Sequence, residues 1–193
     1  MTGQNAPAHR RIIPAGELAA RALDLSREPA RERSASSLET GLVVLRLGRE
    51  WYGVPAGLVQ EVAGSPEITP VPMTPPFVAG VLNLRGELVG VLDLAVLFGL
   101  PAAAGAAARR PAVVVRLQGL TAALLADAVL EVEWFAAADR EPVLPTLPAE
   151  AAGFLAGVMR DGGRLVMELN IEKILAHPPL AALRGETAGE ERI

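Results

Sequence analysis

Short apolar runs, rich in valine and leucine and bounded by glycine or proline, recur along residues 41–176. Their lengths and their bounding residues are typical of many short β-strands rather than of long helices. Because closing a sheet removes its exposed edges, short strands at such close spacing predict one or two small closed barrels. The runs are 42–47, 51–54, 58–63, 88–92, 112–117, 120–126, 128–134, 155–159 and 164–169.

Polar residues and glycines between the runs predict how the strands are joined. Residues 48–50 and 118–119, which contain Gly-Arg-Glu and Gln-Gly, are expected to form hairpin turns. Asp93 and Asn170 each precede a short helical pattern. Their side chains can accept hydrogen bonds from the unpaired N–H groups of a first helical turn. Each half of the body is therefore expected to end in a short capped helix.

Residues 77–98 and 154–175 are two copies of one pattern, 77 positions apart. FVAGVLNLRGELVGVLDLAVLF aligns with FLAGVMRDGGRLVMELNIEKIL, and 8 of the 22 positions are identical. Chance pairing in a chain of this composition would give roughly two identities. A second register, offset by 70, relates residues 41–47 to residues 111–117. These repeats predict an internal duplication.

The duplication divides the chain into an extension, a body and a tail. Within the extension, residues 17–25 could form a short amphipathic helix, followed by a charged, flexible linker. Such a helix could be a docking peptide or part of a frayed terminus, because about ten residues are marginal alone. The expected boundaries are 1–40 for the N-terminal extension, 41–176 for the body, with halves at roughly 41–100 and 111–175, and 177–193 for the C-terminal tail.

Composition narrows the kind of protein and its partners. The chain is 51% hydrophobic and 21% charged, with a net charge of −4, so it can bury a core and lacks the basic stripe that nucleic acids require. It has no cysteine, which excludes disulfides and thiolate metal sites. Its longest uncharged stretch, Ile68–Leu84, contains four prolines, which argues against a membrane span. We therefore expect a soluble, cytoplasmic protein that does not bind nucleic acid.

The sequence contains few residues that could form a catalytic site. Residues 41–175 contain no histidine, no cysteine and one serine, Ser65. No Ser/His/Asp set, acid–base pair, phosphate-binding glycine loop or metal-ligand cluster has recognisable spacing. Active sites depend on tuned titratable groups, so we predict a protein that is not an enzyme, needs no cofactor or metal and acts by binding.

Arg85 is the most informative polar residue, because the two copies differ there. The first copy contains Asn83-Leu84-Arg85-Gly86, whereas the second has Arg160-Asp161-Gly162 in place of residues 83–85. Gly86 can take the positive φ of a tight turn, and a guanidinium on such a turn offers five donors to carboxylates or carbonyls of a partner. The alternative is a solvated turn arginine. For Asn83 the alternative is a side chain that bonds its own turn.

Several other polar and aromatic residues have structural interpretations. Glu61 matches Glu131, which favours a structural or solvated role, and Gln60 gives no clear signal. Phe77 and Phe154 occur in both copies and are expected to anchor the core. Trp51 and Tyr52 are adjacent on a predicted strand and point to opposite faces, so only one of them can belong to the core.

The segment VQEVAGSPEITPVPMTPPFVAGVLNLRGELVGVLDLAVLFGL (59–100), with LLADAVLEV (124–132) in the second half, resembles the CheW family of chemotaxis coupling proteins. The resemblance covers about Gly41 to Leu175. Its most specific part is P-x-F-V-x-G-V-x-N-L-R-G, followed by V-x-D-L and F-G-L. Three positions depart from the family pattern: Gly90 replaces a proline, Ala95 an arginine and Asn170 an aspartate.

This resemblance implies a mainly β fold of two small, intertwined five-stranded barrels with a few short helices and a groove at their junction. It implies a non-catalytic adaptor that links the cytoplasmic hairpin tips of chemoreceptors to a CheA-type histidine kinase, with membrane contact only through the receptors. A helical tip would dock in the groove. The site residues implied are Arg85, Asn83 and Gly80 for receptor binding, and Val59, Gln60 and Glu61 for a surface that binds receptor or kinase.

Other functions are compatible with a small β fold: the barrels could bind an oligonucleotide or an unrelated protein partner, or form a divergent hydrolase. An oligonucleotide-binding module would need basic and aromatic residues on one face, and the chain is acidic with only 4% aromatic residues. A divergent hydrolase would need a polar cluster in the groove. The departures at Gly90, Ala95 and Asn170 also leave open a chemosensory pathway other than flagellar chemotaxis.

Overall fold

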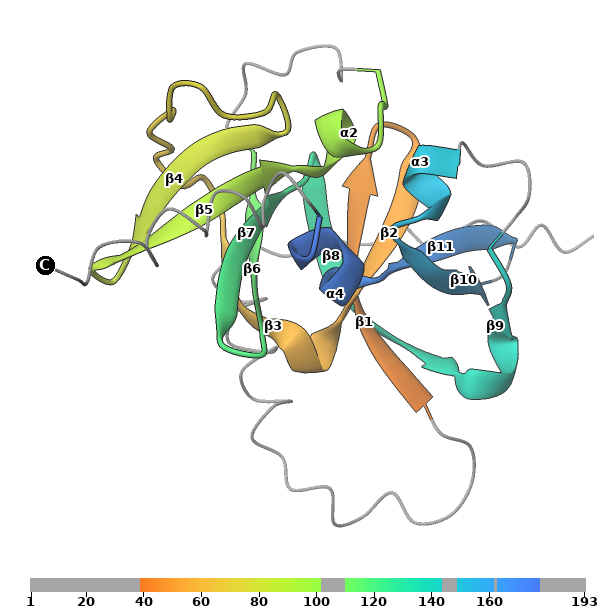
Figure 1. Ribbon diagram of the computed structural model, residues 1–193. Coiled ribbons are helices and arrows are strands. Elements are labelled where there is room, and N and C mark those ends of the chain that lie inside the picture. The colour runs from red at the N-terminus through yellow and green to blue at the C-terminus, as the bar shows by residue number, and fades with distance from the viewer. Residues whose placement is uncertain (1–38, 102–109, 144–148, 162, 178–193) are drawn as a thin grey trace, which may run out of the picture.

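The computed structural model describes residues 39–101, 110–143, 149–161 and 163–177 (Figure 1). Most of these residues are in strands, as the short apolar runs predict. The strands are β1 (Glu39–Leu47), β2 (Glu50–Pro55), β3 (Val59–Ala63), β4 (Val78–Leu84), β5 (Glu87–Asp93), β6 (Ala112–Leu117), β7 (Leu120–Leu125), β8 (Ala128–Ala136), β9 (Arg140–Glu141), β10 (Leu155–Asp161) and β11 (Arg164–Leu169).

The helices are short and stand at the ends of strands. The Asp93 side chain accepts hydrogen bonds from the backbone N–H groups that follow it, and Asn170 Oδ1 accepts one from Lys173 N at 3.0 Å. Both predicted helix caps are confirmed. The helices are α2 (Leu94–Leu97), α3 (Ala149–Ala152) and α4 (Ile171–Leu175), with the 3₁₀ turns η1 (Ala56–Leu58) and η2 (Ala137–Asp139).

The strands form two sheets that share the two halves of the chain. The six-stranded sheet has the order β8-β1-β2-β11-β10-β9, and the five-stranded sheet has the order β3-β6-β7-β5-β4. Each half places its first two strands in one sheet and its later strands in the other. Figure 1 shows the sheets side by side, with α4 between them. The prediction of a mainly β fold of two small intertwined units with a few short helices is confirmed. Five strands were expected in each unit, and one sheet has six, because β9 adds a two-residue strand where, among the described residues, the other sheet has only the single bridge Thr69–Val81.

Strand register repeats between the sheets as the duplication predicts. β5 pairs in parallel with β7, where Gly90 faces Ala122, and β11 pairs in parallel with β2, where Met167 faces Tyr52. These are equivalent positions, because Gly90 and Met167 differ by 77 and Tyr52 and Ala122 by 70. The bulge in β4 at 78–80 likewise recurs in β10 at 155–157. The two sheets are therefore related element by element.

The tight turns follow from residues that tolerate positive φ. Gln118 and Gly119 have φ values of 50° and 81°, and Arg85 and Gly86 have φ values of 53° and 92°. Two successive positive φ angles are the signature of the type I′ turn that joins twisted antiparallel strands. The positive φ of Gly86 was expected. That of Arg85 was not, because a side-chain residue is uncommon in this region.

The main hydrophobic core lies between the sheets and joins them. Tyr52 stacks on Phe98 with ring centroids 5.3 Å apart, and Phe98 lies 5.9 Å from Phe154. Phe77 and Phe154 are partly buried and pack against this core, as their place in both copies predicts. Tyr52 is 1% exposed, while Trp51 packs partly buried against a separate cluster, so only one of the pair is in the main core.

Several expectations concern residues outside the described part of the chain. The possible N-terminal helix at 17–25, its linker, most of the segment between the two predicted halves (102–109) and the tail from residue 178 lie there. Within the described residues, no helix is long and apolar enough to cross a membrane. Among those same residues, no group of three or more His, Cys, Asp or Glu side chains is placed to hold a metal ion.

Candidate functional site

A groove opens where the five-stranded sheet meets α4, and we call it the junction groove. Its volume is about 430 Å³, within the range of ligand and peptide pockets. Leu92, Ala122 and Leu175 lie at its floor and are almost fully buried. The remaining lining residues come from β4, β5, the start of β7 and the loop before β4. They are Val71, Thr74, Val78, Gly80, Val81, Leu88, Gly90 and Thr121.

The sheet register explains why these side chains share one face. Asn83 faces Leu88 across the β4–β5 hairpin, and Val81 faces Gly90. Residues two apart on a strand point to the same side, so the groove face continues from β7 through β5 to β4. Leu88 on this face is 72% exposed and Val71 is 39% exposed. Neighbouring exposed apolar side chains are typical of an interaction surface.

The β4–β5 turn and Glu61 form a charged corner at the tip of the hairpin whose strands line the groove, and we call it the hairpin corner. Arg85 Nη2 donates to Glu61 Oε2 at 2.5 Å. The Arg85 side chain is 80% exposed and that of Glu61 is 16% exposed. Glu61 therefore binds one nitrogen of the Arg85 guanidinium, and the rest of the guanidinium faces solvent. Asn83 Oδ1 accepts a hydrogen bond from Gly86 N at 2.7 Å, which closes the turn.

Met73 projects from the loop that borders the groove. It is fully exposed and has a φ of 63°. This left-handed backbone conformation is energetically unfavourable for methionine. Thr74 Oγ1 donates to Val71 O at 2.8 Å and holds the turn around it. We did not predict this residue from the sequence. An apolar side chain between Pro72 and the Thr74-Pro75 pair was the available signal.

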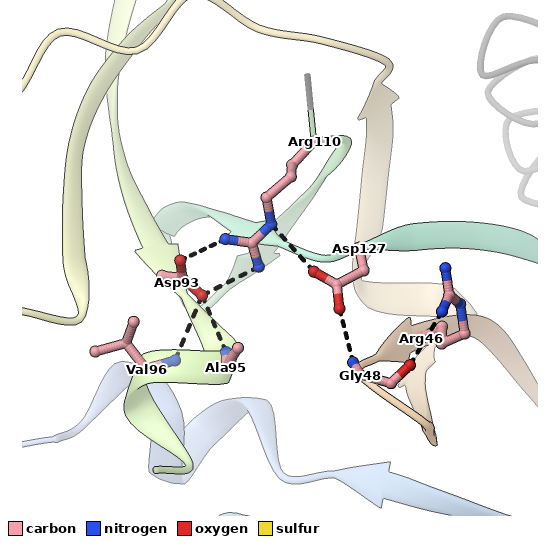
Figure 2. A network of polar contacts seen from close by, with 7 residues as sticks. All are labelled: Arg46, Gly48, Asp93, Ala95, Val96, Arg110 and Asp127. Atoms are coloured by element: carbon pink, nitrogen blue, oxygen red, sulfur yellow. Dashed lines mark hydrogen bonds and ion pairs between the residues drawn. The ribbon is translucent and has the colours of Figure 1, made fainter. Parts of the chain in front are cut away.

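A largely buried ionic network centred on Arg110 includes Asp93, the residue that follows the groove-floor residue Leu92 (Figure 2). Arg110 lies between two carboxylates: its Nη atoms contact both oxygens of Asp93 at 2.5 and 3.2 Å, and its Nε lies 3.3 Å from Asp127 Oδ1 without hydrogen-bond geometry. Asp93 also caps α2, and Asp127 Oδ2 accepts from Gly48 N at 2.7 Å. The network therefore ties α2 to the β1–β2 turn of the other sheet.

Comparisons with known proteins agree with this architecture. Residues 41–178 match the family model for the CheW-like domain. The chain belongs to the CheW-like family. A solved structure, the scaffolding protein TtCheW from Thermoanaerobacter tengcongensis, aligns with a TM-score of 0.62 and 29% identity over 69% of this chain and 90% of that chain.

Relatives with three different names are similar to most of this chain. The chemotaxis protein CheW of Klebsiella aerogenes is 31% identical over 72% of this chain and 83% of its own length. Protein FrzA of Myxococcus xanthus is 36% identical over 67% of this chain and 81% of its own length. Protein PilI of Pseudomonas aeruginosa is 31% identical over 67% of this chain and 71% of its own length.

The residues that the CheW resemblance marks for receptor binding lie together on β4 and its turn. Arg85 is exposed, and Asn83 uses its side chain within the turn, which is the structural role considered for it. Gly80 lines the groove but is buried, with a φ of 141°. A Cβ on it would lie 2.2 Å from Thr69 O. Its missing side chain thus makes room for the chain's own backbone, and its part in receptor binding stays a prediction.

The second group of CheW-derived residues lies on β3, at the edge of the five-stranded sheet. Val59 is 7% exposed and belongs to the core, whereas Gln60 is half-buried at a bulge between Val59 and Glu61. The repeat predicted a structural or solvated role for Glu61, with no link to Arg85. The structure brings the two together as an ion pair, so the β3 surface and the hairpin corner are continuous.

The CheW-like duplication is not symmetric in charge. In the six-stranded sheet, Arg160 stands where the first copy has Asn83, and it forms a two-pronged pair with Glu141 at 2.9 and 3.1 Å. This hydrogen-bonded pair lowers the pKa of Glu141 below its ordinary value. Arg164 lies 5.2 Å from the centroid of the Trp51 ring and also pairs with Glu133. Arginines here are satisfied within the sheet, unlike the outer edge of Arg85.

Proposed function

We propose that this chain is a non-catalytic adaptor that joins the cytoplasmic hairpin tips of chemoreceptors to a CheA-type histidine kinase. The pathway would be chemotaxis or a related chemosensory system. Family membership supports this proposal, as do the names of the relatives. The observation on which it depends most is an apolar groove lined by the β4–β5 hairpin, whose turn carries the exposed side chain of Arg85.

The shape and chemistry of the junction groove suit a helical partner. Its lining residues are apolar except for two threonines, and none of these described side chains is ionisable. A helix binds such a groove through apolar side chains spaced at i, i+3, i+4 and i+7. A hydrolase would need titratable groups at this place. The lining therefore favours docking over catalysis.

The hairpin corner would supply the polar contact at the rim. Glu61 accepts from one Nη atom of Arg85, and the exposed edge of the guanidinium can donate to carboxylates or to free carbonyls at a helix C-terminus. Since Glu61 belongs to β3, a partner on Val59–Glu61 would contact the same ion pair. We leave open whether the β3 surface binds receptor or kinase.

The variant Arg85→Asp tests the function. Removing the guanidinium and placing a carboxylate beside Glu61 is expected to weaken binding to a receptor cytoplasmic hairpin by about 2 kcal/mol or more, because it removes an arginine contact and adds a repulsive charge. Titration calorimetry with the purified hairpin measures this loss. Circular dichroism is expected to show an unchanged fold, because the residue is exposed.

Arg49→Asp provides a matched control. Arg49 is also an exposed arginine on a hairpin turn, but it lies between β1 and β2 in the other sheet and does not line the groove. This control is expected to bind the receptor hairpin normally. Full activation of the kinase by receptors, with Arg85→Asp as the only adaptor present, would contradict the proposed role.

A further inference from the structure

The duplication allows each position of the junction groove to be compared with its equivalent in the other sheet. Gly90 on β5 faces Ala122 on β7. The equivalent pair in the six-stranded sheet is Met167 on β11 facing Tyr52 on β2. Two of the smallest side chains in one sheet thus correspond to two large ones in the other.

The large side chains of Met167 and Tyr52 fill the space on the inner face of the six-stranded sheet. Met167 is 7% exposed and Tyr52 is 1% exposed, and both belong to the main core. Tyr52 stacks on Phe98, which is the equivalent of the groove residue Leu175. Burial raises the pKa of Tyr52, with a further contribution from its hydrogen bond to Glu50, so the ring is neutral and apolar in character.

Gly90 and Ala122 leave the equivalent space in the groove open. Leu88 in the first copy is 72% exposed, whereas its equivalent Leu165 is partly buried against the core. A Cβ built on Gly90 meets no atom within 4 Å, and Gly90 does not have positive φ. Neither backbone conformation nor packing therefore demands a glycine. Because glycine within a strand costs about 0.5–1 kcal/mol relative to alanine, the open space has an energetic cost.

We propose that Gly90 and Ala122 form a pocket for one bulky apolar side chain of the docked helix. In the six-stranded sheet, Tyr52 and Met167 fill the equivalent space with an aromatic ring and a thioether. In the groove, a side chain of the partner would fill it. This inference rests on the proposed function, since it assigns a specificity pocket within the same groove. The six-stranded sheet indicates the occupant, because an aromatic ring and a methionine fit the equivalent place.

The occupant would pack on the buried floor of the groove. Leu92, Ala122 and Leu175 are 2%, 7% and 3% exposed. A side chain entering over Gly90 reaches this floor, as Tyr52 reaches Phe98 in the other sheet. The pocket would select helices with a large apolar residue at the facing position over helices with alanine there. One large-to-small change in an apolar pocket is typically worth 10- to 200-fold in affinity.

Gly90→Met tests the pocket by installing the equivalent residue of the second half. We expect it to weaken binding of the purified receptor hairpin at least tenfold, while binding to the kinase regulatory domain and the unfolding midpoint stay unchanged. Gly57→Met is the matched control, because Gly57 is exposed, has open space around its Cβ position and lies outside the groove. If Gly90→Met does not fold, Gly90→Ala and Gly90→Val give a graded series.

A scan of the receptor hairpin identifies the inserted side chain. Each large apolar residue at its tip is replaced with alanine, and one replacement is expected to weaken binding to the wild-type adaptor at least tenfold but to have little further effect with Gly90→Met. Equal binding by Gly90→Met and Gly57→Met would overturn the pocket and leave the adaptor function standing. Absence of any binding by the wild-type chain would instead refute the adaptor function.

Two other occupants would also overturn the proposal. If a chain ending at His177 binds the hairpin at least tenfold more tightly, and Gly90→Met removes that difference, the C-terminal segment is the occupant. If Gly90→Met abolishes self-association in sedimentation velocity while receptor binding is unchanged, a second copy is the occupant.

Discussion

Gly80→Ala is expected to lower the free energy of unfolding by about 3 to 5 kcal/mol. Gly80 has a φ of 141°, which is strained for any residue with a side chain. A Cβ there would lie 2.2 Å from Thr69 O and 2.8 Å from Thr69 C, both backbone atoms of the loop that borders the groove. Because Thr69 also forms a bridge with Val81, the loop cannot move aside without losing hydrogen bonds. Urea unfolding measures the loss.

The duplication provides a control for Gly80→Ala at the equivalent position of β10. A Cβ on Gly157 would come 2.7 Å from Arg140 Nε and 3.2 Å from Glu141 O, and Gly157 does not have positive φ. The close contact is with a side chain that can shift at the expense of its ion pair with Glu168, so Gly157→Ala is expected to cost less than Gly80→Ala, about 1 to 2 kcal/mol. If the two alanine variants were equally stable, the close backbone contact would not be what demands Gly80.

Arg110→Met is expected to destabilise the fold by about 3 to 4 kcal/mol, the usual range when one partner of a buried ion pair is removed. The Asp93 and Asp127 side chains are 15% and 11% exposed. Without the guanidinium, these two carboxylates face each other in a poorly hydrated place (Figure 2). Methionine retains much of the aliphatic packing, so the loss reports the charge. Thermal and urea unfolding check this value.

Arg116→Met is the corresponding control for Arg110→Met. Its ion pair with Glu87 is long, at 3.7 Å, and both side chains are about half exposed. Exposed pairs of this kind contribute about 0–1 kcal/mol. A loss of similar size in the two variants would indicate that removal of any arginine stem, rather than the buried network, explains the effect.

Features that depend on residues near one another in the chain could be predicted. The helix caps at Asp93 and Asn170 and the hairpin turns follow from local side-chain and backbone preferences. The duplication followed from two aligned copies. By contrast, α3 and the two-residue strand β9 were not predicted, because they are short and depend on packing against distant strands.

The candidate site was predictable in part for the same reason. Arg85 stood out because only one copy contains it, but its partner Glu61 lies 24 residues away and is reached only through the sheet. Arg110 gave no signal at all, since its two aspartates are contributed by different elements. The role of Gly90 required the strand register, which shows that it faces Ala122 as Met167 faces Tyr52.

The exchange of strands between halves has a consequence for biosynthesis. β2 pairs with β11, where Trp51 faces Val166. The edge of β2 can therefore be paired only after Val166 has left the ribosome. At ordinary translation rates the interval is on the order of ten seconds. During it the nascent chain presents an unpaired apolar edge, the kind of segment that invites aggregation. We therefore expect the six-stranded sheet to be completed only after β11 has been translated.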